Sequence, residues 1–306
     1  MGADIAVVTG GGGFIGSHLA DALLAQGLRV RVVDNFVTGR RPLVPAGAEL
    51  VEGDVNEVAS RAVEGADVVY HLAALPSVPR SVKMPMESHR ATAQGTLALL
   101  SAAEQASVRR VVVASSSSVY GDTPTLPKRE TMAPRPLSPY ATAKLCAELY
   151  ASYWATRGKM ETVSLRFFNV YGPRQDPDSP YAAVIPIFIR CIREGKPMPV
   201  NGDGGQTRDF TFVADVVRGL TLAGSARGVS GRVYNLAGGA PISVLDMGRA
   251  LAKLTGREAT FEFGPPRPGD IRDSFADVAA ARRDLGFAAA VPLEEGLRRT
   301  LEWFTA

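Results

Sequence analysis

Two short stretches of the chain carry residue types that could transfer a proton. The first is Ala114–Gly121, in which four consecutive serines follow the apolar run 111–113. In the second, Tyr140 and Lys144 are four residues apart, so on a helix they lie on one face about one turn apart. A phenol has a reference pKa of about 10, and a nearby cation would help it to act as a base near neutral pH. A surface tyrosine beside a solvated lysine is the structural alternative, as a flexible linker is for the serines.

A glycine-rich turn near the start of the chain predicts a dinucleotide site. Gly10, Gly13 and Gly16 have G-x-x-G-x-x-G spacing, and Gly11 with the last two also gives G-x-G-x-x-G. Glycine allows positive φ and lets the backbone approach a pyrophosphate, which the N-terminus of a following helix attracts. Asp34 stands 18 residues after Gly16, near the distance at which an acid binds the adenosine ribose. The pair predicts NAD rather than NADP, because a carboxylate repels a 2′-phosphate.

Two neighbouring features are less specific. Arg40 and Arg41 follow Asp34 and argue mildly for a 2′-phosphate, although they lie several residues downstream. Asp54 and Val55 follow the next short strand and are expected to hold the adenine edge. A loop acid that caps a turn is an equally good interpretation of Asp54 on spacing alone.

Composition excludes several other classes of function. The 306 residues carry a net charge of +3, with no cluster of Lys and Arg, so we expect no nucleic-acid binding. Three scattered histidines have no metal-ligand spacing, and we expect no metal site. Two cysteines give no disulfide framework, and no run of residues is long and apolar enough to predict a membrane span. A soluble, cytoplasmic protein is expected, with no signal peptide.

The elements that must position these residues alternate between strand and helix. Apolar runs predict strands at 5–8, 30–33, 68–72, 111–113 and 162–166, with helices at 17–26, 94–105 and 139–157 between several of them. Such alternation predicts an α/β fold with a doubly wound parallel sheet covered on both faces. Ser138 is a plausible N-cap of the last helix, with Pro139 at its first position. Residues 1–172 are expected to form the nucleotide-binding domain, joined by a later strand near 210–237. Residues 173–306, rich in Pro and Gly at first, are expected to form a smaller α/β substrate-binding region over the carboxyl edge of the sheet.

Taken together, these motifs resemble the extended short-chain dehydrogenase/reductase family. The resemblance runs from Thr9–Gly16 through His71–Ala74, Ser115–Gly121, Tyr140–Lys144, Arg166–Pro173 and Gly202–Asp215 to Arg267–Asp270, in the family's order. It implies a Rossmann-type fold and a catalytic triad in which Ser116 is the hydroxyl four residues before Tyr120. Tyr140 is then the acid/base, and Lys144 orients the ribose and lowers the tyrosine pKa.

The resemblance also implies two sets of binding residues. Those expected to hold NAD are Gly10, Gly13, Phe14, Ile15, Gly16, Asp34, Asn35, Thr38, Gly39, Asp54, Val55, Leu72, Ala73, Ala74, Ser115, Tyr140, Lys144 and Phe168. Those expected to hold a UDP-sugar are Ser77, Ser116, Tyr140, Asn169, Ala183, Val184, Val200, Arg208, Arg267, Asp270 and Ser274. In this set Asn169 binds the diphosphate, the two arginines bind the phosphates as their planar fork suits, and Asp270 holds the uridine ribose.

The serine run bears on which reaction the family triad performs here. Relatives that eliminate water place Asp-Glu directly after the catalytic hydroxyl, and the decarboxylases keep Glu at the second position; here the two positions are Ser117 and Ser118. With no extra carboxylate, the simplest remaining reaction is reversible oxidation at C4 of the sugar, hence 4-epimerisation. NAD would be regenerated in each cycle.

The resemblance leaves the sugar open. Four residues after Asp270, where a tyrosine restricts relatives to UDP-glucose and UDP-galactose, this chain has Ser274. The segments 74–81 and 175–186 also resemble the UDP-N-acetylglucosamine branch, so UDP-GlcNAc/UDP-GalNAc is the favoured pair. UDP-glucose/UDP-galactose and a UDP-uronate are the alternatives among enzymes, and a non-catalytic dinucleotide sensor is a distant one. By the same resemblance, helices near 94–105 and 140–157 are expected to pair two subunits as a four-helix bundle.

Overall fold

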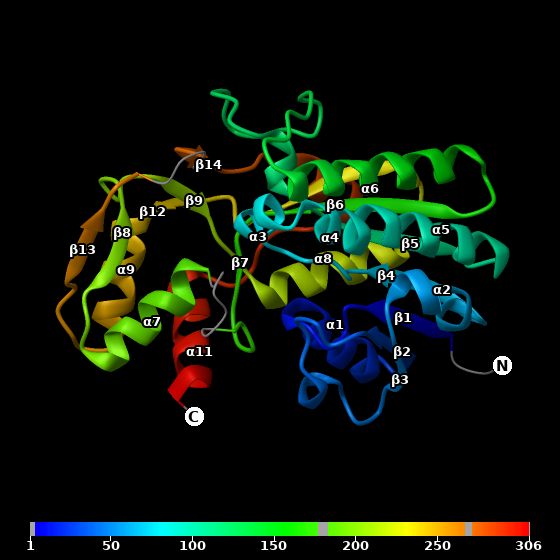
Figure 1. Ribbon diagram of the computed structural model, residues 1–306, viewed down its shortest axis with the longest axis horizontal. Coiled ribbons are helices and arrows are strands. Elements are labelled where there is room, and N and C mark those ends of the chain that lie inside the picture. Colours follow the sequence, from blue (N-terminus) through cyan, green and yellow to red (C-terminus); the bar gives the residue numbers. More distant parts are fainter. Residues whose placement is uncertain (1–3, 177–182, 267–270, 306) are drawn as a thin grey trace.

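The centre of the molecule is a seven-stranded parallel sheet (Figure 1). The computed structural model describes residues 4–176, 183–266 and 271–305. The strand order is β11-β6-β5-β4-β1-β2-β3, and every neighbouring pair is parallel. Helices cross over both faces, since parallel strands need such connections and bury both faces. The predicted α/β class and the doubly wound, Rossmann-type sheet are confirmed.

The elements of the chain follow in order. The central sheet contains β1 (Ile5–Thr9), β2 (Arg29–Asp34), β3 (Glu49–Glu52), β4 (Ala66–His71), β5 (Arg110–Ser116), β6 (Glu161–Phe167) and β11 (Arg232–Leu236). The shorter strands are β7 (Val170–Tyr171), β8 (Met198–Asn201), β9 (Thr207–Asp209), β10 (Thr211–Phe212), β12 (Pro241–Ser243), β13 (Phe261–Gly264) and β14 (Asp273–Ser274). The helices are α1 (Phe14–Ala25), α2 (Val55–Val63), α3 (Val78–Lys83), α4 (Pro85–His89), α5 (Gly95–Gln105), α6 (Pro139–Thr156), α7 (Val184–Glu194), α8 (Val213–Ser225), α9 (Val244–Leu254), α10 (Ala279–Leu285) and α11 (Leu293–Thr305). Three single turns, η1 (Arg41–Leu43), η2 (Arg90–Gln94) and η3 (Ser117–Tyr120), complete the set.

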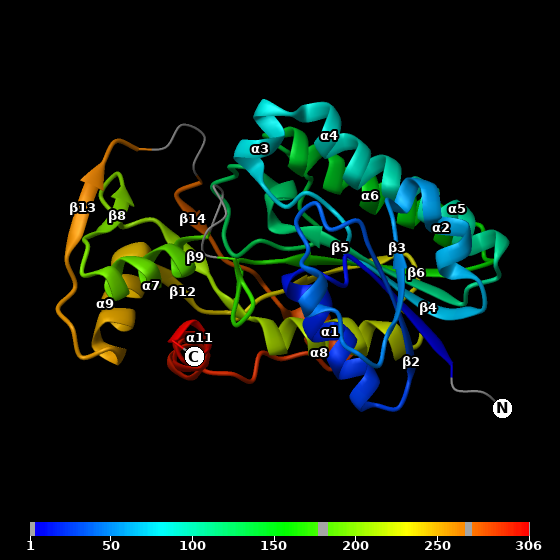
Figure 2. The same cartoon turned by 60° about the horizontal axis from the view of Figure 1, so that its bottom comes forward.

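Strand alternation divides the core into two layers. In β1 the side chains of Ala6 and Val8 belong to the cluster that includes α1 and α8, whereas Val7 belongs to the cluster with α2, α5 and α6. This is the period of two that a strand buried on both faces imposes. The helices therefore cover opposite faces of the sheet, as Figure 2 shows.

Two helix starts matter for the site. Ser138 caps α6, accepting a hydrogen bond from the backbone of Ala141, and Pro139 occupies the first turn, as predicted. The sequence predicts the first helix over 17–26, whereas the structure begins it at Phe14 with Gly13 as N-cap. The earlier start brings the free N–H groups of the first turn directly to the end of the glycine turn.

The chain after β7 forms a smaller lobe beside the sheet (Figure 1). It holds the parallel pair β8–β13, the three-stranded sheet β12-β9-β14, and the helices α7, α9 and α11. Helix α8 and strand β11 return to the main body, where β11 pairs with β6 at one edge of the large sheet. One continuous apolar cluster joins α1 and α8 to α7, α9 and α11, so the two parts share a core.

A buried amide ties the edge strand to the surrounding loops. Asn235 in β11 accepts a hydrogen bond from the hydroxyl of Tyr120 at 2.7 Å, and its amide donates to the carbonyls of Lys128 (3.0 Å) and Asp277 (3.1 Å). Every polar atom of this side chain is thereby satisfied, as burial requires. The segment after η3 is held against the edge strand β11 in this way.

Candidate active site

The carboxyl ends of β1, β2, β4 and β5 bring the predicted residues to one edge of the sheet. The glycine turn follows β1, Asp34 ends β2, Leu72–Ala74 follow β4, and Ser115 and Ser116 end β5. In a parallel sheet these ends face the same way, which makes this edge the usual ligand site of open α/β folds.

The glycine turn is shaped so that only glycine fits at two positions. Gly10 has φ of 69°, the left-handed region. A Cβ on Gly16 would lie 2.1 Å from the carbonyl oxygen of Gly10. The backbone of the turn therefore lies directly against the first turn of α1, where free N–H groups and the helix dipole favour an anion. This bare cradle fits the pyrophosphate of a dinucleotide.

Asp34 organises the loops around that cradle. Its carboxylate accepts hydrogen bonds from the backbone N–H of Gly12 at 2.9 Å and of Phe36 at 2.8 Å. Burial raises its pKa, and the backbone hydrogen bonds act in the opposite direction. Gly39 lies so close that a Cβ there would be 2.7 Å from the carboxylate oxygens, and Arg40 donates from its backbone to Gly12 at 2.8 Å. Asn35 and Thr38 are exposed in this loop.

Asp54 has a local role in the structure. It is the N-cap of α2, where its side chain accepts hydrogen bonds from the backbone of Asn56 at 2.9 Å and from the side-chain amide of Asn56 at 2.7 Å. This is the turn-capping alternative recognised in the sequence. Contact of Asp54 and Val55 with an adenine stays a prediction.

A neutral histidine joins the first and fourth strands beneath the cofactor edge. His71 lies 2.8 Å from Thr9 Oγ1 and 3.0 Å from Thr96 Oγ1. Burial, together with the charge of Lys144, lowers the pKa of His71 to about 3. Thr9 Oγ1 also accepts from the backbone N–H of Leu72 and Ala73, both at 3.2 Å. The loop after β4 is thus held against the glycine turn.

The three predicted catalytic side chains converge where β5 ends and α6 begins. Tyr140 is half-buried in the first turn of α6 and forms a hydrogen bond with Ser116, the last residue of β5. Burial raises the pKa of Tyr140, and the bond with Ser116 opposes this rise. The phenol therefore needs a positive neighbour before it can lose its proton near neutral pH.

Lys144 supplies that positive charge from one turn further along α6. Its side chain is only 5% exposed, and its Nζ donates to the carbonyl oxygen of Ala114 in β5 at 2.7 Å. The Nζ is 6.0 Å from the ring centroid of Tyr140. Burial lowers the pKa of Lys144 to about 8, while the charge of Glu148 acts to raise it.

The two serines after Ser116 form a short turn in place of an acid pair. Ser118 donates to Ser116 Oγ from its backbone N–H at 3.2 Å and from its hydroxyl at 2.9 Å. Both Ser117 and Ser118 belong to η3. Neither side chain is a carboxylic acid that could donate a proton beside the triad.

Sequence reasoning missed a buried ion pair behind the catalytic strand. Glu148 in α6 binds Arg166 in β6 through two contacts, 2.8 Å from Nε and 2.7 Å from Nη2, and accepts a hydrogen bond from Ser115. The clue was available, because Glu148 lies four residues after Lys144 and eight after Tyr140, on the same helix face.

The expected sugar-nucleotide residues are spread over several elements of the smaller lobe and its border. Asn169 stands just before β7 with the unusual φ of 26°, and its amide donates to the carbonyl of Asp209 at 3.3 Å. Arg208 in β9 is half-buried and donates to the carbonyls of Thr207 at 2.8 Å and Arg272 at 3.2 Å. Positive φ at a non-glycine residue is a costly conformation that often marks a functional position.

The remaining expected residues differ in accessibility. Ser77 caps α3, Ala183 precedes α7 and is exposed, and Val184 is half-buried. Val200 in β8 is 2% exposed and packs in the core, Phe168 is fully buried against Tyr120, and Ser274 pairs with Arg208 between β14 and β9. Arg267 and Asp270 lie outside the described residues.

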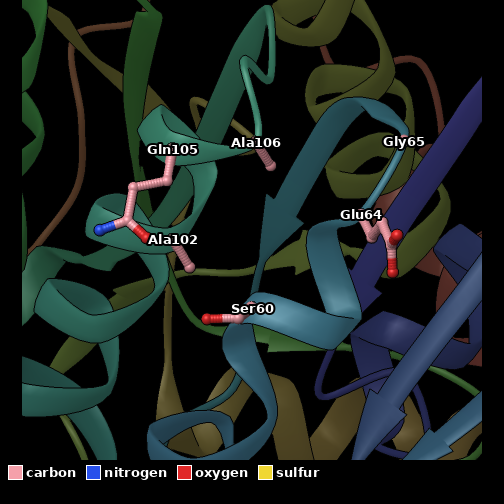
Figure 3. Close-up of a pocket in the computed structure, with 6 residues that line it drawn as sticks. All are labelled: Ser60, Glu64, Gly65, Ala102, Gln105 and Ala106. Atoms are coloured by element: carbon pink, nitrogen blue, oxygen red, sulfur yellow. The ribbon is translucent and has the colours of Figure 1, made fainter.

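A cavity elsewhere on the molecule is separate from this site (Figure 3). It lies between the C-terminal ends of α2 and α5, lined by Ser60, Glu64, Gly65, Ala102, Gln105 and Ala106. Strand β4 starts directly after Gly65, so this is the amino edge of the sheet. Within 4–176, 183–266 and 271–305 no cluster of His, Cys, Asp and Glu is suited to a metal ion. None of the helices described there is long and apolar enough to span a membrane.

Comparison with known proteins gives consistent matches over the whole chain. The model of the "NAD dependent epimerase/dehydratase family" matches residues 6–237. A UDP-glucose 4-epimerase of Mycolicibacterium smegmatis is 38% identical over 97% of each chain. The solved structure of a UDP-glucose 4-epimerase from Thermus thermophilus in complex with NAD is 36% identical, with a TM-score of 0.90 over 99% of each chain. That of a UDP-N-acetylglucosamine 4-epimerase from Methanobrevibacter ruminantium M1, in complex with UDP-N-acetylmuramic acid, is 34% identical, with a TM-score of 0.95 over 100% of this chain and 99% of the other.

Proposed function

The chain belongs to the NAD-dependent epimerase/dehydratase family, whose cofactor is NAD, and we propose that it is a UDP-sugar 4-epimerase. The observation that carries the proposal is the convergence of Tyr140, Lys144 and Ser116 beside a turn that holds Ser117 and Ser118 instead of acids. The carboxylate of Glu148 is bound by Arg166 and Ser115 and is not free to act as a second acid. A site with a single acid/base residue is suited to the reversible oxidation of one carbon, because that reaction needs only one proton to be removed and returned.

The chain's own residues handle the proton and orient the sugar. Tyr140 removes the proton from the C4 hydroxyl and returns it when the opposite epimer forms. Lys144 keeps a positive charge near the phenol and so favours the tyrosinate. Ser116, which interacts with the phenol of Tyr140, would also hydrogen-bond the C4 oxygen of the sugar. NAD, when bound by the glycine cradle, supplies the hydride acceptor and donor at C4.

We propose UDP-GlcNAc and UDP-GalNAc as the preferred pair of substrates. Support comes from Ser274, a small side chain at the family position that borders the sugar's C2 substituent, now seen in β14 beside Arg208. Arg208 with Asn169 would bind the diphosphate. Arg267 and Asp270, which lie outside the described residues, complete the expected set.

The test is to incubate purified protein separately with UDP-GlcNAc, UDP-glucose and UDP-glucuronate, without added NAD, and to resolve the C4 epimers. Conversion of UDP-GlcNAc faster than of UDP-glucose is expected. Conversion of UDP-glucose alone would contradict the acetyl-sugar preference, and conversion of the uronate alone would assign the uronate activity. A stable 4-keto-6-deoxy product would overturn the epimerase itself, and binding of NAD without turnover would favour a dinucleotide sensor.

We also propose a homodimer in which α5 and α6 pair with their copies, in the cytoplasm. Leu149 (61%) and Tyr153 (53%) of α6 and Leu97 of α5 are exposed apolar side chains, and α5 packs beside α6. Apolar side chains gathered on neighbouring helices suit a helix–helix interface. A reducing compartment agrees with the free Cys146 and Cys191.

A further inference from the structure

The buried carboxylate of Glu148 is enclosed by three groups from different elements. On one side it pairs with Arg166 of β6, and both side chains are 4% exposed. On another it accepts a hydrogen bond from the hydroxyl of Ser115 in β5, and Lys144 lies one turn earlier on its own helix. Removing charged groups from water is costly, so such a pair persists only with good geometry and further hydrogen bonds.

The ring of Tyr120 packs against the arginine of this ion pair. The guanidinium carbon of Arg166 lies 4.6 Å from the ring centroid of Tyr120, whose hydroxyl is bound by Asn235. Burial would lower the pKa of Arg166, but hydrogen bonds and the charge of Glu148 raise it, so the arginine remains a cation. Its Nη1 has no hydrogen-bond partner within the described residues. Without Glu148 this cation would be left uncompensated behind the active site.

We propose that Glu148 is a positioning residue for the reaction, which places a negative charge one turn from Lys144 and anchors the end of the catalytic strand β5 through Ser115. The inference deepens the proposed 4-epimerase function and rests on it for the link to turnover. Two observations join Glu148 to the triad. Tyr140, Lys144 and Glu148 share one face of α6, and Ser115 directly precedes Ser116.

The charged and titratable groups around Lys144 determine in which direction Glu148 shifts the pKa of this lysine. Glu148 is the anion that acts on it, and Arg166 of β6 is the cation paired with that anion. Lys144 also donates to the carbonyl of Ala114 and lies near Tyr140 and neutral His71 in β4. Because burial lowers the pKa of Lys144 and the charge of Glu148 raises it, removing the carboxylate is expected to lower this pKa further. Lys144 then loses its proton at a lower pH, and Tyr140 loses the cation that stabilises its anion.

The first experiment compares the pH profiles of kcat/KM for the wild type, Glu148→Gln and Arg166→Gln. With Glu148→Gln we expect the basic limb to move down by about one pH unit or more, together with a loss of activity near pH 8 of about tenfold or more. Arg166→Gln leaves the anion in place, and its basic limb is expected to stay or move up. A merely structural pair would lower the activity of both variants and leave both limbs where they are in the wild type, which would overturn the proposal.

Further variants keep the test decisive if Glu148→Gln does not fold. The double variant Glu148→Gln/Arg166→Gln leaves neither partner of the ion pair behind alone, and its basic limb is also expected to move down. Glu148→Asp keeps the charge and is expected to retain the wild-type limb at reduced rate. Glu104→Gln, in the exposed pair with Arg157 at the end of α6, is the matched control and should leave the profile unchanged.

A second readout needs no substrate, so its failure is distinct from failure of the 4-epimerase assignment. The rate at which trace acetic anhydride acetylates Lys144 is followed against pH in the free protein, by mass spectrometry of its peptide. A midpoint near pH 8 is expected for the wild type and a lower one for Glu148→Gln. Equal midpoints would overturn the role of Glu148, even if the wild type epimerises UDP-sugars. A shifted midpoint in a protein that converts no UDP-hexose would uphold the charge effect and refute the 4-epimerase.

Discussion

At the residue scale, a few side chains and their neighbours decide the chemistry. Tyr140 is buried enough that its pKa is raised, so its use as a base depends on the cation one turn away. Ser116 connects it to the strand, and the next two serines leave the triad without a second acid. The same fold with carboxylates at these two positions would be equipped for elimination as well.

Replacing Ser274 by tyrosine tests the sugar preference at this scale. Ser274→Tyr is expected to lower kcat/KM for UDP-GlcNAc by roughly 10- to 200-fold, because the phenol fills the space proposed for the N-acetyl group. Activity on UDP-glucose, measured in the same preparation, serves as the control and should change little. Equal losses on both sugars would show that Ser274 does not border the C2 substituent.

The raised pKa of the buried Asp209 carboxyl predicts that the free energy of unfolding depends on pH. Its fully buried carboxylate accepts from the backbone N–H of Gly239 at 3.0 Å and of Ala276 at 3.3 Å, but burial still raises its pKa to about 6. The folded state therefore binds this proton more tightly than the unfolded chain does. The stability from Asp209 is fully present below about pH 4 and is lost as the pH rises through about 6.

The measurement is the free energy of unfolding in urea at pH 4 and pH 7 for the wild type and Asp209→Asn. The difference, wild type minus variant, should fall by roughly 2 kcal/mol between the two pH values. Asp203→Asn is the control. Hydrogen bonds from Arg272 and Gly205 lower the pKa of Asp203 to about 2, so its contribution is present above about pH 4 and should change little between pH 4 and pH 7. A difference for Asp209→Asn that rises with pH would contradict the prediction.

At the scale of elements, two helices do most of the positioning. Helix α6 presents Tyr140, Lys144 and Glu148 on one face toward β5 and β6. Its N-cap fixes where the helix begins and so sets the position of Tyr140 in the first turn. Helix α1 brings its first turn against the glycine turn. In both, the position of the first residue decides which groups reach the site.

Close packing of α11 against the short strands β7 and β10 predicts that a larger residue at Gly296 lowers the stability of the fold. A Cβ on Gly296 would lie 2.2 Å from the hydroxyl of Tyr171 and 2.9 Å from the ring of Phe212. Gly296→Ala is expected to lower the free energy of unfolding by about 1–3 kcal/mol, since overpacking forces the helix away from the strands. Urea denaturation measures this loss.

The matched control is Gly95→Ala in α5. Gly95 has helical φ and ψ of −59° and −40°, and its Cβ would meet nothing nearer than 3.6 Å. Alanine there is expected to be neutral or to add up to about 1 kcal/mol through helix propensity. Destabilisation by Gly95→Ala equal to that of Gly296→Ala would mean that local packing does not explain the effect.

At the scale of the whole molecule, the helices on one face of the sheet leave apolar side chains exposed. Besides Leu149 and Tyr153 of α6, Val82 of α3 and Met86 of α4 are exposed, and α3 and α4 both pack beside α6. Figure 2 shows these helices together on one side of the molecule. Contiguous exposed apolar side chains commonly mark an interface.

Leu149→Arg tests the proposed dimer. Sedimentation velocity is expected to give about twice the chain mass of 32.4 kDa for the wild type and a monomer for the variant, because a buried unpaired charge opposes association. Phe263→Arg, an equally exposed apolar position on β13 in the smaller lobe, is the control and should leave the dimer intact. A monomeric wild type would refute the dimer.

Much of the fold was predictable from local pattern. Alternation of short apolar runs with helical segments indicated the parallel sheet, and Ser138 with Pro139 marked the start of α6 correctly. The start of α1 was placed three residues late, because helix propensity counts against the glycine at position 16. The close contact between Gly16 and Gly10 matters more than the low helix propensity of glycine at this position. Such a contact cannot be predicted from a local sequence pattern.

The sequence by itself determined the class of fold and the NAD family and predicted the triad, since glycine spacing, a four-residue helical interval and motif order are local properties of the chain. Only the tertiary structure decided what surrounds the triad. It pairs Glu148 with Arg166, a residue 18 positions away, and places Ser115 against both. It also makes Asp54 a helix cap and gives Asp34 two backbone hydrogen bonds. These depend on which segments meet and on how far each side chain is removed from water, and a linear pattern specifies neither.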